Sequence, residues 1–283
     1  MSNLLFKRWN DFSGWMVFLI AALVYGMTIE PTASFWDCPE FISCAEKLQV
    51  GHPPGAPFYM LVGNLFTQFA SDAKYVSYTV NFLNALLSAG CILFLFWSIT
   101  RLVRSLITSD KEKLSVTDFI IILGSGVVGA LAYTFSDTFW FSAVEGEVYA
   151  FSSFLTALVF WMILRWQDEA DSVSGDRWII LIAYVIGLSI GVHLLNLLCI
   201  PAIVLVFYYR KYQVISLKGV IGAIALSGLL IVLILFIYIP GMADIGGCSK
   251  AILIVNSMKV PLYFTEELML PNRSIYLKEN IIR

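Results

Sequence analysis

Residues 30–70, EPTASFWDCPEFISCAEKLQVGHPPGAPFYMLVGNLFTQFA, place ionisable side chains between two strongly apolar regions of the chain. Asp37, Glu40, Glu46 and His52 all lie in this stretch. In a chain this apolar, ionisable groups beside the bilayer are costly enough that they usually mark a functional site. We therefore expect the rest of the molecule to be organised around this segment.

The composition is that of a polytopic membrane protein. The chain has 283 residues, of which 59% are hydrophobic and 13% are charged, whereas soluble domains carry about 25% charged residues. A formal net charge of −2 argues against a nucleic-acid partner, because binding to phosphates needs clustered positive charge. No phosphate-binding loop, nucleophile elbow or dinucleotide fingerprint occurs, so ATP, acyl-serine and dinucleotide chemistry have no support. The five cysteines show no metal-binding or redox spacing.

Apolar runs predict an all-α transmembrane bundle of about seven spans, because a bilayer core about 30 Å thick needs about 20 apolar residues per helix. The predicted spans are residues 12–29, 76–100, 117–136, 148–166, two short helices within 178–209, and 218–239. The first span is expected to be retained, because no small-residue cleavage site precedes Glu30. The apolar run 56–70 is too short for a span and predicts a buried or interfacial helix.

Glycines at positions 124, 126 and 129 of the third span would permit close helix contact. The domain organisation that follows is a transmembrane domain over residues 1–245 and a less apolar segment over residues 246–283. We expect this last segment to be a short extracytoplasmic tail, or the end of a truncated chain.

Lysines and arginines give the expected orientation, because they are enriched in cytoplasmic loops. Eleven of the 18 basic residues fall next to the predicted spans in alternate loops: Lys7, Arg8, Arg101, Arg104, Lys111, Lys113, Arg165, Arg177, Arg210, Lys211 and Lys218. The segment 30–70 contains only Lys47. The N-terminus is therefore expected in the cytoplasm, and the first loop, with its short helices, on the extracytoplasmic face. The same map places Asp137 on that face.

Asp37 and Glu40 are the candidate catalytic residues. Their spacing of three puts both carboxylates on one face of a helix that starts here. The alternative is a capping box, with Asp37 as N-cap and Glu40 at the third helical position, which needs no chemistry. The preceding Phe35 and Trp36 favour the catalytic interpretation, since an apolar setting would raise the pKa of a carboxylate and suit a general base.

His52 lies in Gly-His-Pro-Pro-Gly, a rigid turn that presents the imidazole instead of packing it. The alternative is an ordinary loop histidine between two helices. Glu145 and Glu147 open the fourth span, where the helix dipole alone favours acidic residues. Because they occupy alternate positions, we expect one to face a substrate or cation and the other to face water.

His193 and Asn196 lie near the turn within residues 178–209 and complete the set of candidate substrate-binding residues with His52, Glu145 and Glu147. A lone histidine among apolar residues is more often a hydrogen-bonded core residue, and that interpretation stays open for His193. Asn81 and Asn84 are expected to hydrogen-bond between helices.

No spacing requires a metal, and no metal ligands are assigned. A divalent cation is compatible with the carboxylates of Asp37, Glu40, Glu145 and Glu147, which are hard oxygen ligands suited to Mg²⁺, Mn²⁺ or Ca²⁺.

Four motifs in order, FWDCPEF, GHPPGAPF, SAVEGEVYAF and GLSIGVHLLNLLCIPA, resemble a large family of bacterial multi-pass membrane proteins. That family is related to the animal protein O-mannosyltransferase that acts on receptor ectodomains, within the GT-C glycosyltransferases. The similarity covers residues 10–245. Relatives are usually longer, so this chain would be a shortened member that lacks part of the acceptor site.

The resemblance implies transfer of a sugar, with mannose as the candidate, from a polyprenyl-phosphate carrier to a Ser or Thr hydroxyl of a secreted or membrane protein. The transfer would invert the anomeric centre and take place on the extracytoplasmic face of a bacterial inner membrane. GT-C enzymes place an acidic catalytic base in the first outer loop, and the matching residue here is Asp37, with Glu40 as its neighbour. His52 or His193 would stabilise the leaving phosphate.

Three other interpretations remain open from the sequence. The chain would be an inactive fragment if the missing part carries essential residues. A non-catalytic membrane assembly protein would tolerate loss of Asp37. A small-molecule transporter would gather polar residues near the middle of the bilayer, whereas the polar residues here are predicted at one face.

Overall fold

The computed structural model describes residues 2–245 except 54, 108–113, 173–174, 213 and 243. Residues 246–283, predicted as a tail, lie outside the described residues, as do Lys111 and Lys113. The chain divides into two compact units, Met1–Ile224 and Ala225–Arg283. The boundary falls inside helix α10, and each unit is described by itself.

The described residues form an all-helical structure without strands, as the sequence predicts. In chain order the elements are α1 (Asn3–Met27), α2 (Cys38–Lys47), α3 (Pro57–Thr67), η1 (Ala73–Tyr75), α4 (Val76–Ile107), α5 (Val116–Thr134), α6 (Asp137–Ala143), α7 (Val148–Glu169), α8 (Gly175–Ile190), η2 (Leu194–Leu198), α9 (Cys199–Lys211), α10 (Leu217–Leu233) and η3 (Ile234–Tyr238).

Six helical stretches of the described chain are long and apolar enough to cross a membrane: Asn3–Met27, Ala73–Ile107, Val116–Thr134, Val148–Glu169, Leu194–Lys211 and Leu217–Met242. These agree with the predicted spans except in one place. The run 178–209 forms two helices with a turn between them, as expected, but α8 has only 16 residues, which is short for a span. The run 56–70 forms α3, an 11-residue helix, so the prediction of a helix too short to span is confirmed.

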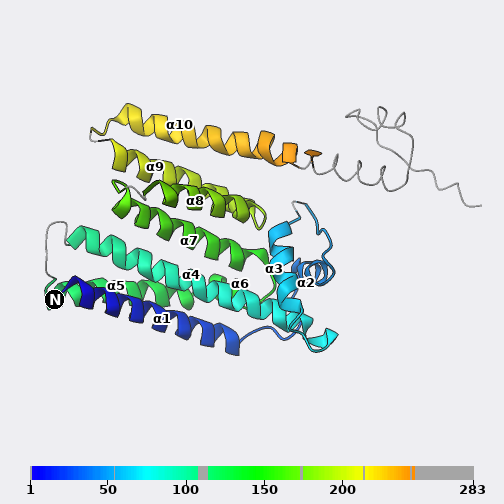
Figure 1. Ribbon diagram of the computed structural model, residues 1–283. Helices are drawn as coiled ribbons and strands as arrows, with labels where there is room; N and C mark the ends of the chain where they lie inside the picture. The colour runs from blue at the N-terminus through cyan, green and yellow to red at the C-terminus, as the bar shows by residue number, and fades with distance from the viewer. Residues whose placement is uncertain are drawn as a thin grey trace, which may run out of the picture. The chain divides into compact units, whose positions relative to one another are not determined.

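Helix α4 is the centre of the first unit and packs against α1, α5 and α7 (Figure 1). It is the most buried of the candidate spans. One core lies between α1, α4 and α5, and a second joins α2, α3, α7 and α8. Large apolar side chains of α1 such as Leu19 and Leu23 are exposed on the outer surface, as expected where a helix meets lipid.

Two of the three glycines in α5 allow this helix to approach α4 closely. A methyl group at Gly126 would lie 2.5 Å from the Thr100 side chain, and one at Gly129 would lie 2.7 Å from Ile99. Gly124 has no neighbour within 4 Å of such a methyl group. The predicted close contact is therefore confirmed for Gly126 and Gly129 and is wrong for Gly124.

The two ends of this unit differ in charge. At one end, which we call the basic end, Arg104 of α4 contacts Asn3 of α1, and Arg210 of α9 pairs with Asp171 after α7. At the other end, which we call the polar end, α2 and α3 pack together and against α4 (Figure 1). The loop between α6 and α7 passes close to α2, where Gly146 lies beside Ile42. The Glu30 N–H donates to the Val144 carbonyl there, at 3.1 Å.

The glycine contacts predict a matched pair of stability effects. Gly126→Ala should lower the free energy of unfolding by about 1–3 kcal/mol, because the added methyl group overpacks the α4–α5 contact. Gly124→Ala should leave stability unchanged or raise it slightly, since alanine favours a helix more than glycine does. Thermal unfolding of the purified protein in detergent measures both. Equal stability of the two variants would contradict the packing described here.

Candidate active site

Two buried asparagines of α4 hold the loops that carry the candidate site. The Asn81 amide donates to the carbonyls of Glu30 and Thr32, at 2.7 and 2.9 Å. The Asn84 amide donates to the carbonyls of Glu145 and Glu147, at 2.5 and 2.7 Å. Both side chains are fully buried. The prediction that these residues hydrogen-bond between helices is confirmed for Asn84, whose amide oxygen accepts from the Tyr59 hydroxyl of α3 at 3.4 Å, and is wrong for Asn81. Both amide groups also tie loop backbone, whose carbonyls lack the internal partners of a helix, to the central helix.

The loop that carries both glutamates passes close to α2 and α4 because its middle residue is glycine. A methyl group at Gly146 would lie 2.9 Å from the Ile42 side chain and 3.0 Å from the Asn81 amide oxygen. No larger residue fits this space without moving one of these neighbours. The glycine of the Glu-Gly-Glu sequence thus lets the loop that leads into α7 pack against α2, the helix that begins after Asp37.

Asp37 is the residue that precedes α2, and its side chain makes no capping hydrogen bond. The capping-box interpretation is therefore wrong, and the Asp37 carboxylate is left for other contacts. The residue before it, Trp36, has a φ of 65°, a left-handed conformation that is an outlier for a bulky residue and costs about 1–3 kcal/mol. Phe35 and Trp36 are exposed, so they do not enclose the carboxylates as predicted.

Glu40 lies in the first turn of α2 and makes two contacts with His52. Its carboxylate accepts the His52 backbone N–H at 2.6 Å and contacts the ring Nδ1 at 3.1 Å. The His52 Nε2 lies 3.9 Å from the Asp37 carboxylate. The hydrogen bond to the Glu40 side chain raises the pKa of His52, with smaller contributions from the charges of Glu40, Asp37 and Glu147.

The same contacts, first the His52 backbone N–H and then its ring, lower the pKa of Glu40. The predicted rise in carboxylate pKa is therefore wrong for Glu40. The elevated carboxyl pKa values are found instead at the start of α7.

Glu145 and Glu147 are both buried, so neither faces water as one was expected to. Glu145 accepts a hydrogen bond from the Ser34 hydroxyl, and burial raises its pKa. Burial likewise raises the pKa of Glu147, to about 7, with help from the negative charges of Glu145 and Asp37. Glu147 is therefore a carboxyl group that exchanges its proton near neutral pH.

His193 meets this cluster from the turn after α8. The Leu195 N–H donates to the His193 Nδ1 at 3.2 Å, so the neutral ring carries its proton on Nε2. The ring packs against Tyr149 with centroids 5.5 Å apart, and burial lowers its pKa. The turn is held near His52 because the Phe58 N–H at the start of α3 donates to the Gly191 carbonyl at 2.7 Å.

These side chains enclose a small cavity of about 70 Å³ at the polar end. Its lining residues are Asp37, Phe41, His52, Gly55, Ala56, Glu147, Val148, Tyr149, Val192 and His193. Since one water molecule occupies about 30 Å³ in the liquid, the cavity has room for the reacting atoms of a substrate and not for a whole sugar chain.

The structure thus brings together five of the seven candidate residues: Asp37, His52, Glu147 and His193 line the cavity, and Glu40 contacts His52 from outside the lining. The other two candidates make different contacts. Glu145 is engaged by Ser34, and the Asn196 side chain accepts hydrogen bonds from Ser152 and Thr156 at 3.0 and 2.6 Å. Asn196 therefore joins α7 to η2 as a buried structural residue. Tyr149 and Ser34 were missed, because neither ionises at neutral pH and neither lies at a motif spacing.

A cation-binding arrangement exists, but with different members from those predicted. One ligand atom each of Asp37, Glu40 and His52 lies within 4.8 Å of the others, whereas Glu145 and Glu147 do not belong to this group. The direct Glu40–His52 contact satisfies both partners without a metal. No metal ligands are assigned.

A search for related proteins identifies one family model. Residues 37–216 match the N-terminal domain of the protein O-mannosyl-transferase TMEM260. The matched segment begins at Asp37 and includes every candidate residue of the site. The chain is 24% identical over 237 residues to protein O-mannosyl-transferase tmem260 of Dictyostelium discoideum. It is 26% identical over 175 residues to protein O-mannosyl-transferase TMEM260 of Mus musculus.

These alignments cover 78% and 62% of this chain but only 27% and 22% of the two relatives. The chain therefore corresponds to about a quarter of their length. No solved structure matches it significantly. The relation to protein O-mannosyltransferases expected from the motifs is confirmed, while the bacterial source stays a prediction. On the family model, which spans well over half of the sequence, this chain belongs to the family of the protein O-mannosyl-transferase TMEM260 N-terminal domain.

Proposed function

We propose that the chain carries the catalytic site of a membrane glycosyltransferase that moves a sugar from a polyprenyl-phosphate carrier to a Ser or Thr hydroxyl of a protein. The names of the relatives support mannose as the sugar and protein as the acceptor. The observation that carries the proposal is the gathering of Asp37, His52, Glu147 and His193 around one cavity. Two carboxylates and two imidazoles provide both a proton acceptor and donors for a leaving phosphate.

The proposed site faces the extracytoplasmic side of the membrane. Support comes from the arrangement of charges along the first unit: lysines and arginines gather at the basic end, and positive charge is favoured on the cytoplasmic side. The candidate residues lie at the other end of the same helices. A lipid-linked sugar would lie with its hydrocarbon chain among the spans and its phosphate near the cavity.

Asp37 is the proposed general base. Among the described residues its carboxylate accepts no hydrogen bond, and its nearest charged partner is the His52 Nε2 at 3.9 Å. The carboxylate is therefore available to take the proton from the acceptor hydroxyl. As that proton leaves, the hydroxyl oxygen forms a bond with the anomeric carbon of the sugar. The bond between the anomeric carbon and the phosphate oxygen breaks, and the phosphate keeps the electron pair.

The two histidines are the proposed donors to the leaving phosphate. His52 has a raised pKa and carries positive charge over a wider pH range than an ordinary histidine. The Nε2–H of neutral His193 is a second donor at the same cavity. Charge that develops in the transition state is best stabilised by groups already held in place, and Glu40 holds His52 through its backbone and its ring. Glu40 is thus a positioning residue that acts through His52.

Glu147 is the proposed proton reservoir of the site. With a pKa of about 7 it is partly protonated at neutral pH. It is buried beside the cavity and interacts electrostatically with both Asp37 and His52. A carboxyl group with this pKa can receive a proton from Asp37 after transfer and return the base to its ionised form.

The role of Asp37 predicts the result of a conservative substitution. Asp37→Asn should lower the rate of sugar transfer at least about 100-fold, the usual contribution of a general base, while the protein stays folded. Transfer from polyprenyl-phosphate mannose to a Ser/Thr peptide is measured with the purified chain. Asp137→Asn is the matched control, because Asp137 begins α6 at the polar end and does not line the cavity. Full activity of Asp37→Asn would exclude this base, and no transfer by the unaltered chain would contradict the proposed activity.

The Glu40–His52 contact predicts a shift in pH dependence. Removing the Glu40 charge lowers the pKa of His52, because the Glu40 side chain is the main cause of its rise. If cationic His52 assists the leaving group, activity falls as pH rises through its pKa. The alkaline limb of the Glu40→Gln profile should therefore move to lower pH, with activity recovering below about pH 6.5, the ordinary histidine value.

Glu46→Gln in the same helix serves as the control for that profile, because the Glu46 side chain makes no described contact with His52. Its pH profile should match that of the unaltered chain. A loss of activity in Glu40→Gln that is equal at every pH would indicate that Glu40 supports only the local structure.

A further inference from the structure

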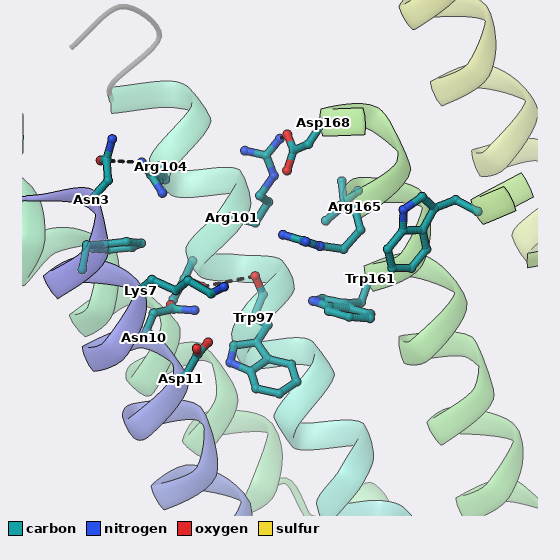
Figure 2. Close-up of a pocket in the computed structure, with 14 residues that line it drawn as sticks. Asn3, Lys7, Asn10, Asp11, Trp97, Arg101, Arg104, Trp161, Arg165 and Asp168 are labelled. Carbon is teal, nitrogen blue, oxygen red and sulfur yellow. Dashed lines mark hydrogen bonds and ion pairs between the residues drawn. The ribbon is translucent and has the colours of Figure 1, made fainter. Parts of the chain in front are cut away.

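A second, larger cavity lies at the basic end of the first unit, between α1, α4, α7 and α8. Its volume is about 500 Å³, within the range of small-molecule binding sites. Figure 2 shows the side chains of three of these helices turned toward the space between them: Asn3, Lys7, Asn10 and Asp11 of α1, Trp97, Arg101 and Arg104 of α4, and Trp161, Arg165 and Asp168 of α7. None of these residues belongs to the candidate active site.

Positive charge exceeds negative charge in this cavity. Four cationic side chains line it, those of Lys7, Arg101, Arg104 and Arg165, against the carboxylates of Asp11 and Asp168. Arg101 pairs with Asp168, and Arg165 pairs with Glu169 at 3.3 Å. Lys7 makes no hydrogen bond or ion pair with any residue that the structure describes, and its ammonium group remains available to a ligand.

Three polar atoms of the lining residues are buried without a hydrogen-bond partner. They are the Nε of Arg101, the indole Nε1 of Trp97 and the side-chain oxygen of Asn10. An unpaired buried donor costs about 1–3 kcal/mol, so most such atoms have partners in native proteins. Two of the three are N–H donors, and they lie beside the cationic groups. The Trp97 indole is packed against Gly14 of α1, so the excess positive charge, and not this donor, is what a ligand with anionic oxygens would neutralise.

The position of the cavity along the helices matches the position expected for lipid head groups. The 22 residues of α7 span about 33 Å at 1.5 Å per residue, close to the thickness of a bilayer core. Glu147 precedes this helix and Asp168 lies in its last turn, so the two cavities lie at opposite ends of a helix long enough to cross a bilayer. Three tryptophans, Trp97, Trp161 and Trp178, line the basic cavity, and tryptophan is enriched where hydrocarbon meets head groups.

We infer that this cavity binds the phosphate group of an anionic membrane lipid on the surface opposite the candidate active site. Lysine and arginine are the side chains that bind phosphate oxygens most strongly. The buried oxygen of Asn10 suits a hydroxyl donor, such as that of a glycerol head group. The apolar faces of Trp161 and Leu164 continue toward the membrane interior and would contact the acyl chains. This inference does not depend on the proposed sugar transfer.

The test is retention of lipid by the purified chain in a zwitterionic detergent, observed by native mass spectrometry. Phosphatidylglycerol should form a one-to-one adduct at concentrations where phosphatidylcholine, which has no net charge, forms none. Lys7→Gln should weaken the adduct about fivefold, the effect of one lysine near an anionic lipid, and Lys7→Arg should restore it. Lys7 is exposed and makes no described contact, so the fold does not depend on it.

Arg177→Gln is the matched control, because Arg177 is a basic residue at the same end, exposed and outside the cavity. It should bind phosphatidylglycerol within a factor of two of the unaltered chain. If Lys7→Gln and Arg177→Gln weaken phosphatidylglycerol binding equally, the lipid is attracted by the overall positive charge of this end and not by a specific site. That result would overturn the inference. The absence of a phosphatidylglycerol adduct would overturn it too. Competition by millimolar inorganic phosphate that removes the lipid completely would assign the cavity to a soluble phosphate compound instead.

Discussion

The hydrogen bonds made by Asn81 and Asn84 are the interactions on which the polar end of the bundle depends. Four loop carbonyls, from Glu30 to Glu147, accept from these two amides on α4. In an apolar environment, a backbone carbonyl without a hydrogen-bond partner costs several kcal/mol. Loops can therefore enter the bundle only where a side-chain donor is positioned to bond their carbonyls. The central helix supplies these donors, and the loops in turn bring Asp37, His52 and Glu147 to one cavity. The chemistry of the site therefore rests on a helix that contributes no reacting group.

The first unit separates its charges along the length of its helices. Carboxylates and imidazoles gather at the polar end, where they raise or lower one another's pKa, and guanidinium groups gather at the basic end. Both ends carry a cavity lined by ionisable groups, and α4 and α7 run between them. Each cavity combines apolar walls with a few polar groups, an arrangement typical of binding sites. We propose that one cavity receives the sugar donor and the acceptor hydroxyl, and that the other binds the phosphate group of an anionic lipid.

The helical bundle was predictable because span length and the distribution of lysine and arginine report directly on the bilayer. The pairing of Asp37 with Glu40 was also predictable from helical spacing. The lowered pKa of Glu40 was not, because it depends on His52 folding back across the loop to bind it. The burial of Glu145 and Glu147 and the hydrogen bonds from Asn84 to their carbonyls could not be predicted from the sequence either. They arise from the close approach of Gly146 to α2 and α4. Helical periodicity does not extend into such loops.

If the proposed roles are right, the acid and imidazole cluster and the basic cavity open on opposite sides of one membrane. Single cysteines at Val50 and Asp176, both exposed and on opposite ends of the unit, test it in a chain whose native cysteines are replaced by serine. A membrane-impermeant maleimide applied to sealed vesicles of known orientation should label Val50→Cys only from the extracytoplasmic side. It should label Asp176→Cys only from the cytoplasmic side. Labelling of both cysteines from the same side, or the reverse orientation, would contradict the account.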